Sequence, residues 1–291
     1  MIIRSACLWL PTLLLFLAVP VAACSSFATY ANGPLYGMNF DYPASAKIRF
    51  VIDTHGDLKV FHLTFSRYER FIPTVGMNSA GLFISDQILE GERTSVSGLD
   101  GETLFPWQLY HRALQECTDV ATVRNFLAKR RLHNDPFLGL HLLIADSSGD
   151  ALIAEVGAKE NALMGIKGDF IVMTNFSLVA NRGRNYDDMS GVGAERYRII
   201  YEELVRNGAQ FDVEQTFAFL SSATNCSPSY PTRCSMVFDP GRGEIFIAME
   251  TDYTRIWKVS LAVGTIETYR GFAEHRQWPL GTDGILATDL N

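Results

Sequence analysis

The stretch V-A-A-C-S-S-F-A-T-Y-A-N-G-P-L-Y-G-M-N-F-D-Y, from Val21 to Tyr42, joins an apolar N-terminal segment to a series of strand patterns. We expect cleavage before Cys24, which would leave a free thiol and a free α-amine on one residue. A free thiol has a pKa of about 8.5 and an α-amine one of about 7.7–8.0, so the amine can take the thiol's proton directly or through one water. The resulting thiolate is a strong nucleophile toward an amide carbonyl. The stretch therefore predicts thiol chemistry, through a thioester, at the first residue of the processed chain.

The segment before Cys24 has the parts of a secretory signal peptide. A positively charged start is followed by an apolar run from Leu8 to Val19 and by three small residues. The apolar run is too short to span a bilayer, and its flanks suit processing. We expect residues 1–23 to be removed and residues 24–291 to form a single catalytic domain. Export to the periplasm or the cell exterior, without a spanning membrane segment, follows from this interpretation.

Composition limits the possible partners. The 291 residues are 47% hydrophobic, enough for one large buried core. The net charge of -7 argues against nucleic acid as the main partner. The tight cationic run at 129–131 is typical of the end of a helix. The histidines are scattered without an H-E-x-x-H motif and the cysteines lack C-x-x-C spacing, so we predict no metal and no cofactor.

The order of hydrophobic patterns predicts an α+β fold. Alternating strand patterns and helical patterns follow one another as strands, helices, strands, helices and strands. This order suits a four-layer αββα sandwich of two stacked antiparallel sheets flanked by helices. The expected strand regions are 25–88, 140–174 and 233–269, and the expected helical regions are 105–132 and 194–220. Cys226, ahead of the last strand region, and Cys234, within it, either form a local disulfide or remain two free thiols.

The chain resembles the N-terminal-nucleophile cysteine hydrolases. Cys24-Ser25-Ser26-Phe27, followed by Gly37-Met38-Asn39-Phe40-Asp41-Tyr42, is similar to the start of this family. The family includes choloylglycine (bile salt) hydrolases, penicillin V acylases, acid ceramidase and the isopenicillin N acyltransferases. Further similar pieces are Gly76–Leu82, the hairpin Leu142–Val156, Thr174–Phe176 and Thr232–Ser235. The resemblance implies the αββα fold, no cofactor, and hydrolysis of the linear amide C–N bond of a small-molecule N-acyl substrate.

The resemblance also implies roles for four residues. Cys24 matches the nucleophile and base, and Asp41 matches the aspartate that orients the N-terminal amine. Asn175 matches an asparagine whose side-chain N–H binds the oxyanion, a contact worth about 2.7–4 kcal/mol. Arg233 matches a late arginine near the nucleophile. By residue type alone, Asp41 and Asn175 also suit strand ends, and Arg233 also suits a surface strand.

One position departs from the family pattern. The hydrolase branch usually carries an arginine where this chain has Met38, and methionine cannot donate a hydrogen bond. The acyltransferase-like members tolerate another residue there, so the change argues against bile-salt hydrolysis rather than against catalysis. The second oxyanion side chain falls in the region of Asp86 or Gln87. Candidates to line an apolar acyl pocket are Phe105, Trp107, Tyr110, Phe137 and Phe176.

Three other interpretations fit the same sequence. Val21–Cys24 also fits a bacterial lipobox, in which Cys24 would be lipidated and the protein anchored through it. A lipid anchor is usually followed by a flexible tether, whereas strand patterns begin at once at Phe27, which favours the enzyme. A non-catalytic binding protein of the same fold remains open as well, as does an acyltransferase of the isopenicillin N type.

Overall fold

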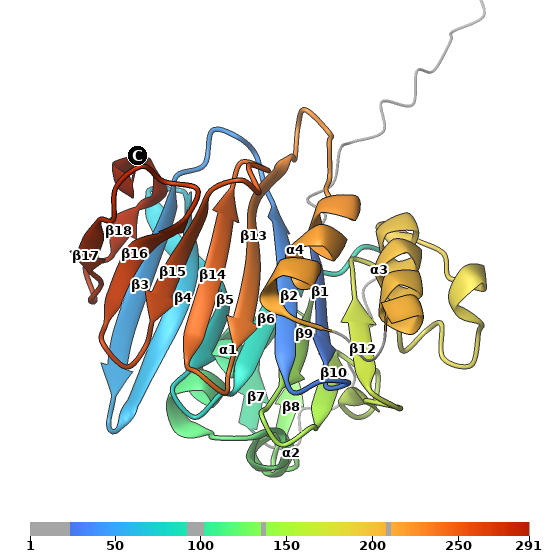
Figure 1. Cartoon of the computed structure of the whole chain (residues 1–291). Helices are drawn as coiled ribbons and strands as arrows, with labels where there is room; N and C mark the ends of the chain where they lie inside the picture. The colour runs from blue at the N-terminus through green and yellow to red at the C-terminus, as the bar shows by residue number, and fades with distance from the viewer. Residues whose placement is uncertain (1–23, 92–101, 135–137, 208–210, 291) are drawn as a thin grey trace, which may run out of the picture.

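The computed structural model describes residues 24–91, 102–134, 138–207 and 211–290. Within these residues two eight-stranded antiparallel sheets pack face to face (Figure 1). The first sheet has the order β12 (Phe170–Met173), β1 (Ser25–Thr29), β2 (Leu35–Asp41), β13 (Thr232–Asp239), β14 (Glu244–Met249), β15 (Ile256–Ser260), β16 (Thr265–Arg270) and β17 (Gln277–Pro279). The second has the order β11 (Ala162–Gly165), β10 (Ala151–Glu155), β9 (Leu140–Ala145), β6 (Phe83–Ile88), β5 (Arg70–Asn78), β4 (Leu58–Arg67), β3 (Ile48–His55) and β18 (Ile285–Leu286).

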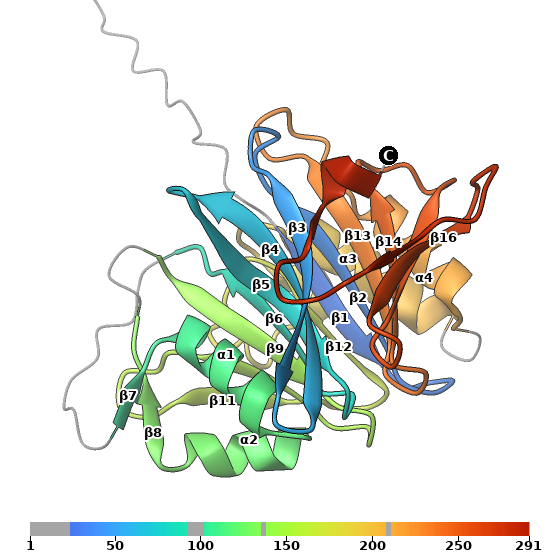
Figure 2. The same cartoon turned by 90° about the vertical axis from the view of Figure 1, so that its left-hand side faces the viewer.

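Helices cover the outer faces of both sheets. The first sheet carries α3 (Ala194–Asn207) and α4 (Val213–Ser222), and the second carries α1 (Pro106–Glu116) and α2 (Val120–Leu127) (Figure 2). The predicted α+β sandwich is therefore confirmed. No helix in the described part of the chain is long and apolar enough to cross a membrane.

Aromatic side chains fill the space between the sheets. Phe238 of the first sheet contacts Phe61 and Phe83 of the second, with ring centroids 6.1 and 4.8 Å apart. All three are fully buried. Because successive strand residues point to opposite faces, each sheet buries a second apolar face under its own helices. Leu109 and Leu114 of α1 pack in this way on the second sheet.

A buried asparagine fastens an outer helix to each sheet. The last four carbonyls of a helix lack partners inside the helix. Asn39 of β2 donates to two of them at the end of α4, Leu220 O at 2.8 Å and Ala223 O at 3.1 Å. Asn78 of β5 donates to two carbonyls at the end of α1, at 3.0 and 2.8 Å. Each asparagine follows a Gly-Met pair, so the tripeptide Gly-Met-Asn binds the end of an outer helix in both sheets.

The helical region expected at 105–132 ends earlier than predicted. α2 ends at Leu127, and Arg130–Leu132 form the short strand β8, which pairs in parallel with β7 (Glu102–Leu104). The cationic run thus lies just beyond the helix rather than in its last turn. Arg130 still donates to the carbonyl of Phe126 at 3.1 Å, which satisfies one of the orphan carbonyls. Cys226 and Cys234 are two free thiols, one exposed and one buried.

We expect Asn78→Ala to lower the free energy of unfolding by about 3 kcal/mol, because two buried carbonyls would lose their donor. Urea denaturation followed by tryptophan fluorescence measures this change. Asn185→Ala, at an exposed asparagine, is the matched control and should change the free energy by less than about 0.5 kcal/mol. Equal free energies of unfolding of the two variants would show that the hydrogen bonds of Asn78 to the end of α1 do not stabilise the fold.

Candidate active site

The pairing of β1 with β2 brings Cys24 and Asp41 together. Ser25 lies opposite Asn39 in the antiparallel register, so Cys24, one residue earlier, lies beside the end of β2. The Sγ of Cys24 is 3.9 Å from the backbone oxygen of Asp41, and only 7% of the cysteine is exposed. The hairpin therefore converts a separation of seventeen positions into direct contact.

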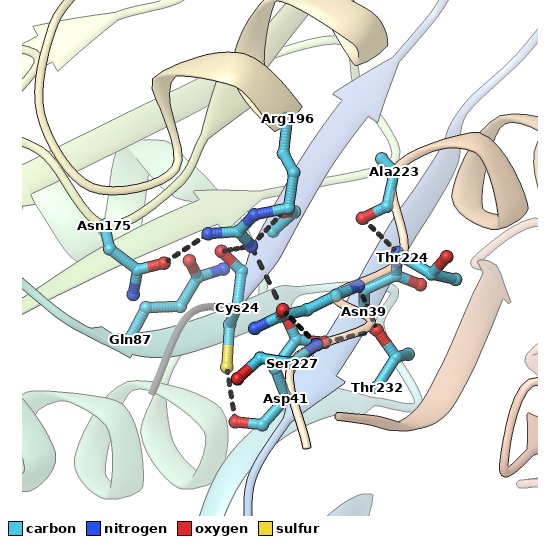
Figure 3. A network of polar contacts seen from close by, with 12 residues as sticks. Cys24, Asn39, Asp41, Gln87, Asn175, Arg196, Ala223, Thr224, Ser227 and Thr232 are labelled. Atoms are coloured by element: carbon cyan, nitrogen blue, oxygen red, sulfur yellow. Dashed lines mark hydrogen bonds and ion pairs between the residues drawn. The ribbon is translucent and has the colours of Figure 1, made fainter. Parts of the chain in front are cut away.

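The carboxylate of Asp41 is fully buried and held from two sides (Figure 3). Its Oδ1 accepts a hydrogen bond from the Thr232 hydroxyl at 2.6 Å, and its Oδ2 lies 3.2 Å from the guanidinium of Arg196. Burial raises the pKa of Asp41 to about 7, although Arg196, Thr232 and Asn225 all favour the charged form. This carboxyl group therefore titrates near neutral pH.

The thiol of Cys24 stays protonated in the full-length chain. Burial raises its pKa to about 12, and the Asp41 carboxylate adds to the rise while Arg196 opposes it. In this chain the nitrogen of Cys24 is an amide and cannot act as a base. An α-amine freed at the same residue would be a base adjacent to the thiol, which the uncut chain does not have.

Arg196, in the first turn of α3, connects the parts of the site. One terminal nitrogen donates to Cys24 O at 3.0 Å, to Ser25 Oγ at 2.8 Å and to Asp41. The other donates to Asn175 Oδ1 at 3.3 Å. The guanidinium of Arg196 thus contacts Cys24 and Asp41, although this chain has Met38 at the position where the resembled family usually has an arginine.

Sequence reasoning missed Arg196, although a signal was present. Arg196 lies four residues before Ile200, so it falls on the stripe of α3 that packs against the sheet. A charged residue on such a stripe needs a buried partner. Gly193 precedes it, and a Cβ at that glycine would lie 2.6 Å from the guanidinium. The glycine therefore makes room for the arginine.

Asn175 follows β12 and is fully buried next to Arg196. Its Nδ2 donates to the carbonyl of Ile88 at 2.8 Å. An amide nitrogen carries two hydrogens, and this hydrogen bond uses one of them. Glu155 holds the following segment by accepting from Ser177 Oγ at 2.5 Å and from Leu178 N at 3.0 Å.

Gln87 lies close by but is oriented by other contacts. Its Nε2 donates to Ser26 Oγ at 2.7 Å and to Ser85 Oγ at 2.9 Å, which uses both amide hydrogens. The structure therefore does not offer Gln87 as an oxyanion donor without a rearrangement. Ser85 also donates to the sulfur of Met38 at 3.3 Å, so Met38 is part of the contact between the two sheets.

The structure does not bring Arg233 into this cluster. Its guanidinium donates to Glu250 Oε1 at 2.7 Å and to the carbonyls of Pro43 and Ala46 at 2.8 and 3.3 Å. The pairing of β13 with β2 shifts register between Thr232 and Cys234, so Arg233 lies in a bulge. The neighbour of Arg233, Thr232, makes the contact with Asp41 instead.

A cavity of about 740 Å³ opens beside Cys24 between β2, β4, β5, β6 and α1. Its walls are mainly apolar and include Phe40, Tyr42, Phe65, Ile72, Trp107 and Leu140. Of the aromatic residues expected to line an acyl pocket, Trp107 does so. Tyr110 bonds His62 under α1, Phe176 lies in the main core, and Phe105 stacks on Trp107. Phe137 lies outside the described residues.

Solved structures share this fold, whereas comparisons with protein-family models and with curated proteins find no match. A variant of conjugated bile acid hydrolase from Clostridium perfringens matches 89% of this chain and 98% of its own, with a TM-score of 0.64 and 15% identity. Penicillin V acylase from Agrobacterium tumefaciens matches 89% of this chain and 96% of its own, with a TM-score of 0.50 and 16% identity. An N-acylethanolamine-hydrolyzing acid amidase ortholog from Caenorhabditis elegans matches 75% and 93%, with a TM-score of 0.50 and 16% identity. These likenesses establish the fold that the sequence resemblance implied.

The raised pKa of Asp41 makes the stability of the protein depend on pH. The folded state binds the proton more tightly than the unfolded state, so this group stabilises the fold at low pH. That contribution declines as the pH rises from about 3.8 toward about 7 and is constant above that. As the pH rises through this window, we expect the unfolding free energy of the wild type to fall relative to that of Asp41→Asn. Urea denaturation of both proteins over a pH series measures it, and a difference independent of pH would contradict the assignment.

Proposed function

We propose that the protein is an amidohydrolase that cleaves the linear amide C–N bond of an N-acyl substrate through a thioester on Cys24. The observation that carries this proposal is that Cys24 and Asp41 meet in the wall of an apolar cavity, with Asn175 joined to both through Arg196. These residues come from separate segments, and Arg196 contacts all three. The names of the structurally similar proteins support the same reaction class, since they are a conjugated bile acid hydrolase, a penicillin V acylase and an N-acylethanolamine-hydrolyzing acid amidase.

The reaction begins once the α-amine of Cys24 is free. The amine takes the thiol proton, and the thiolate attacks the substrate carbonyl carbon. Asn175 donates an N–H to the oxygen that becomes negative in the tetrahedral intermediate. The C–N bond then breaks as the ammonium of Cys24 returns its proton to the leaving amine. Water, deprotonated by the same α-amine, hydrolyses the thioester and releases the acid.

Asp41 holds the charged amine in this scheme. Its carboxylate is close enough to Cys24 to raise the thiol pKa. The same charge would stabilise an α-ammonium by a charge-assisted hydrogen bond. Arg196 acts through these groups rather than on the substrate, because its partners are Asp41, Asn175 and the Cys24 carbonyl. It is a positioning residue.

The proposal includes export and cleavage before Cys24. The signal-like segment ahead of this residue supports both steps. The start of β1 (Ser25–Thr29) directly after Cys24 supports a free thiol over a lipidated one, because a lipid anchor is usually followed by a flexible tether. Intact mass of the mature protein decides between the two. A mass for residues 24–291 alone supports the enzyme, and added lipid mass overturns it.

A panel of amides tests the activity. It should include penicillin V, conjugated bile acids, N-acyl homoserine lactones and N-acyl amino acids. We expect Cys24→Ala to fold and to be exported like the wild type but to hydrolyse none of the substrates that the wild type cleaves. Amidase activity retained in that variant would overturn the mechanism. Added amines that capture the acyl group better than water would identify an acyltransferase instead.

For Arg196 we expect a loss in kcat with little change in KM, because the residue positions the reacting groups without contacting the substrate. Arg196→Met should lower kcat by about a hundredfold, the effect of displacing catalytic groups by about 1 Å. Arg196→Lys should recover part of the loss, because it keeps the charge next to Asp41. Arg198→Met is the matched control on the same helix, since Arg198 bonds the carbonyls of Asp187 and Met189. Equal kcat values in Arg196→Met and Arg198→Met would rule out the positioning role.

A further inference from the structure

The hairpin between β4 and β5 places two arginines directly opposite each other. Arg67 and Arg70 are the closing pair of this hairpin in the antiparallel register. Residues directly opposite in such a pair point to the same face of the sheet, and like charges in this arrangement are destabilising. Both arginines line the cavity that begins at Cys24.

The turn that joins them is also unfavourable. Tyr68 and Glu69 have φ values of 48° and 62°, so both central residues are in the left-handed region. A two-residue turn of this kind strongly prefers asparagine, aspartate or glycine. A bulky tyrosine in this region is an outlier that costs free energy. Strain and like-charge repulsion in one hairpin are the kind of local cost that folded proteins retain at binding sites.

Within the described residues, neither guanidinium is neutralised by a carboxylate. Arg67 lies over the ring of Tyr68, 5.2 Å from its centroid, and no ion pair joins either arginine to an acidic side chain in that part of the chain. An anion placed between the two guanidinium groups would remove their repulsion. The N–H groups of a guanidinium suit a carboxylate, because they can donate to both of its oxygens in one plane.

The charges in the cavity wall are separated along its length. Asp41 and Asp86 lie at the Cys24 end, where both carboxylates raise the pKa of the thiol. Tyr42 lies between the two ends. Burial raises the pKa of its phenol, the charge of Arg67 opposes that rise, and the charge of Cys24 adds to it. The hairpin end of the cavity wall therefore carries positive charge and would attract a negative group of a substrate.

The wall between these two ends is apolar. Phe40, Tyr42 and Phe65 form a contiguous aromatic surface, with ring centroids 4.3 to 5.6 Å apart. A cavity of about 740 Å³ is large enough for a small organic ligand. An apolar chain fits this middle section better than a polar one, because polar groups there would lose water without gaining partners.

We propose that Arg67 and Arg70 form an anion subsite and that the acyl group of the substrate is an apolar chain ending in a carboxylate. The amide carbonyl lies at Cys24, and the distal carboxylate lies between the two guanidinium groups. This assignment rests on the proposed amidohydrolase function for the position of the carbonyl. The subsite itself rests on the hairpin and its two arginines.

Two p-nitroanilides with acyl chains of equal length test the subsite, the suberoyl amide with a terminal carboxylate and the octanoyl amide with a terminal methyl group. We expect wild type to prefer the suberoyl amide in kcat/KM by about tenfold, and to lose this preference as ionic strength rises. Arg67→Gln and Arg70→Gln should each reduce the ratio toward unity, whereas Arg67→Lys should keep part of it. Arg242→Gln, at an exposed turn arginine outside the cavity, is the control and should leave the ratio unchanged.

Binding to the Cys24→Ala protein, measured by titration calorimetry with the same two amides, separates this inference from the proposed function. Arginine-dependent preference for the suberoyl amide in binding, with no hydrolysis by wild type, would retain the subsite and reject the amidohydrolase. Hydrolysis of the octanoyl amide with no preference for the suberoyl amide in rate or binding would reject the subsite and retain the amidohydrolase. Preference that survives in both glutamine variants would also overturn the subsite.

Discussion

The buried carboxylate of Asp41 is the interaction on which the arrangement of the site depends. A charged group away from water costs several kcal/mol unless it is paired and hydrogen-bonded, so Asp41 requires its partners to be in place. Those partners are Thr232 of β13 and Arg196 of α3. Satisfying one side chain therefore fixes β13 against β2 and docks α3 over the end of β1, beside Cys24. The raised pKa of Asp41 shows that the pairing does not fully compensate for burial. A site retained at this cost is consistent with a functional rather than a stabilising role.

Much of the local structure was predictable because it rests on short-range rules. Asn32-Gly33, a pair that favours turns, lies in the connection between β1 and β2, where Gly33 has a φ of 94°. Asp119 and Asp212 cap α2 and α4 by accepting from backbone N–H groups three residues on, at 2.7 and 2.8 Å. The contact of Cys24 with Asp41 follows from the same hairpin, because the register of β1 with β2 places Cys24 beside the end of β2.

The parts that were not predictable depend on tertiary packing. Arg196 reaches Asp41 across 155 positions of sequence, and nothing in the local pattern says which buried partner its helix will meet. Arg233 leaves the cluster because β13 carries a bulge, and a one-residue shift sends a side chain to the other face of a sheet. The repeated Gly-Met-Asn tripeptide does not by itself predict its role, because that role depends on the helix ends to which Asn39 and Asn78 donate.

The proposed catalysis requires the thiol of Cys24 to act together with its own freed α-amine. The most direct measurement compares the rate of Cys24 alkylation at neutral pH in two forms, one beginning at Cys24 and one with a single alanine retained before it. Burial holds the thiol pKa near 12 in the continuous chain, so the extended form should react slowly. We expect much faster alkylation when the amine is free, with a pH dependence that follows the titration of the amine. Equal rates in the two forms would contradict it.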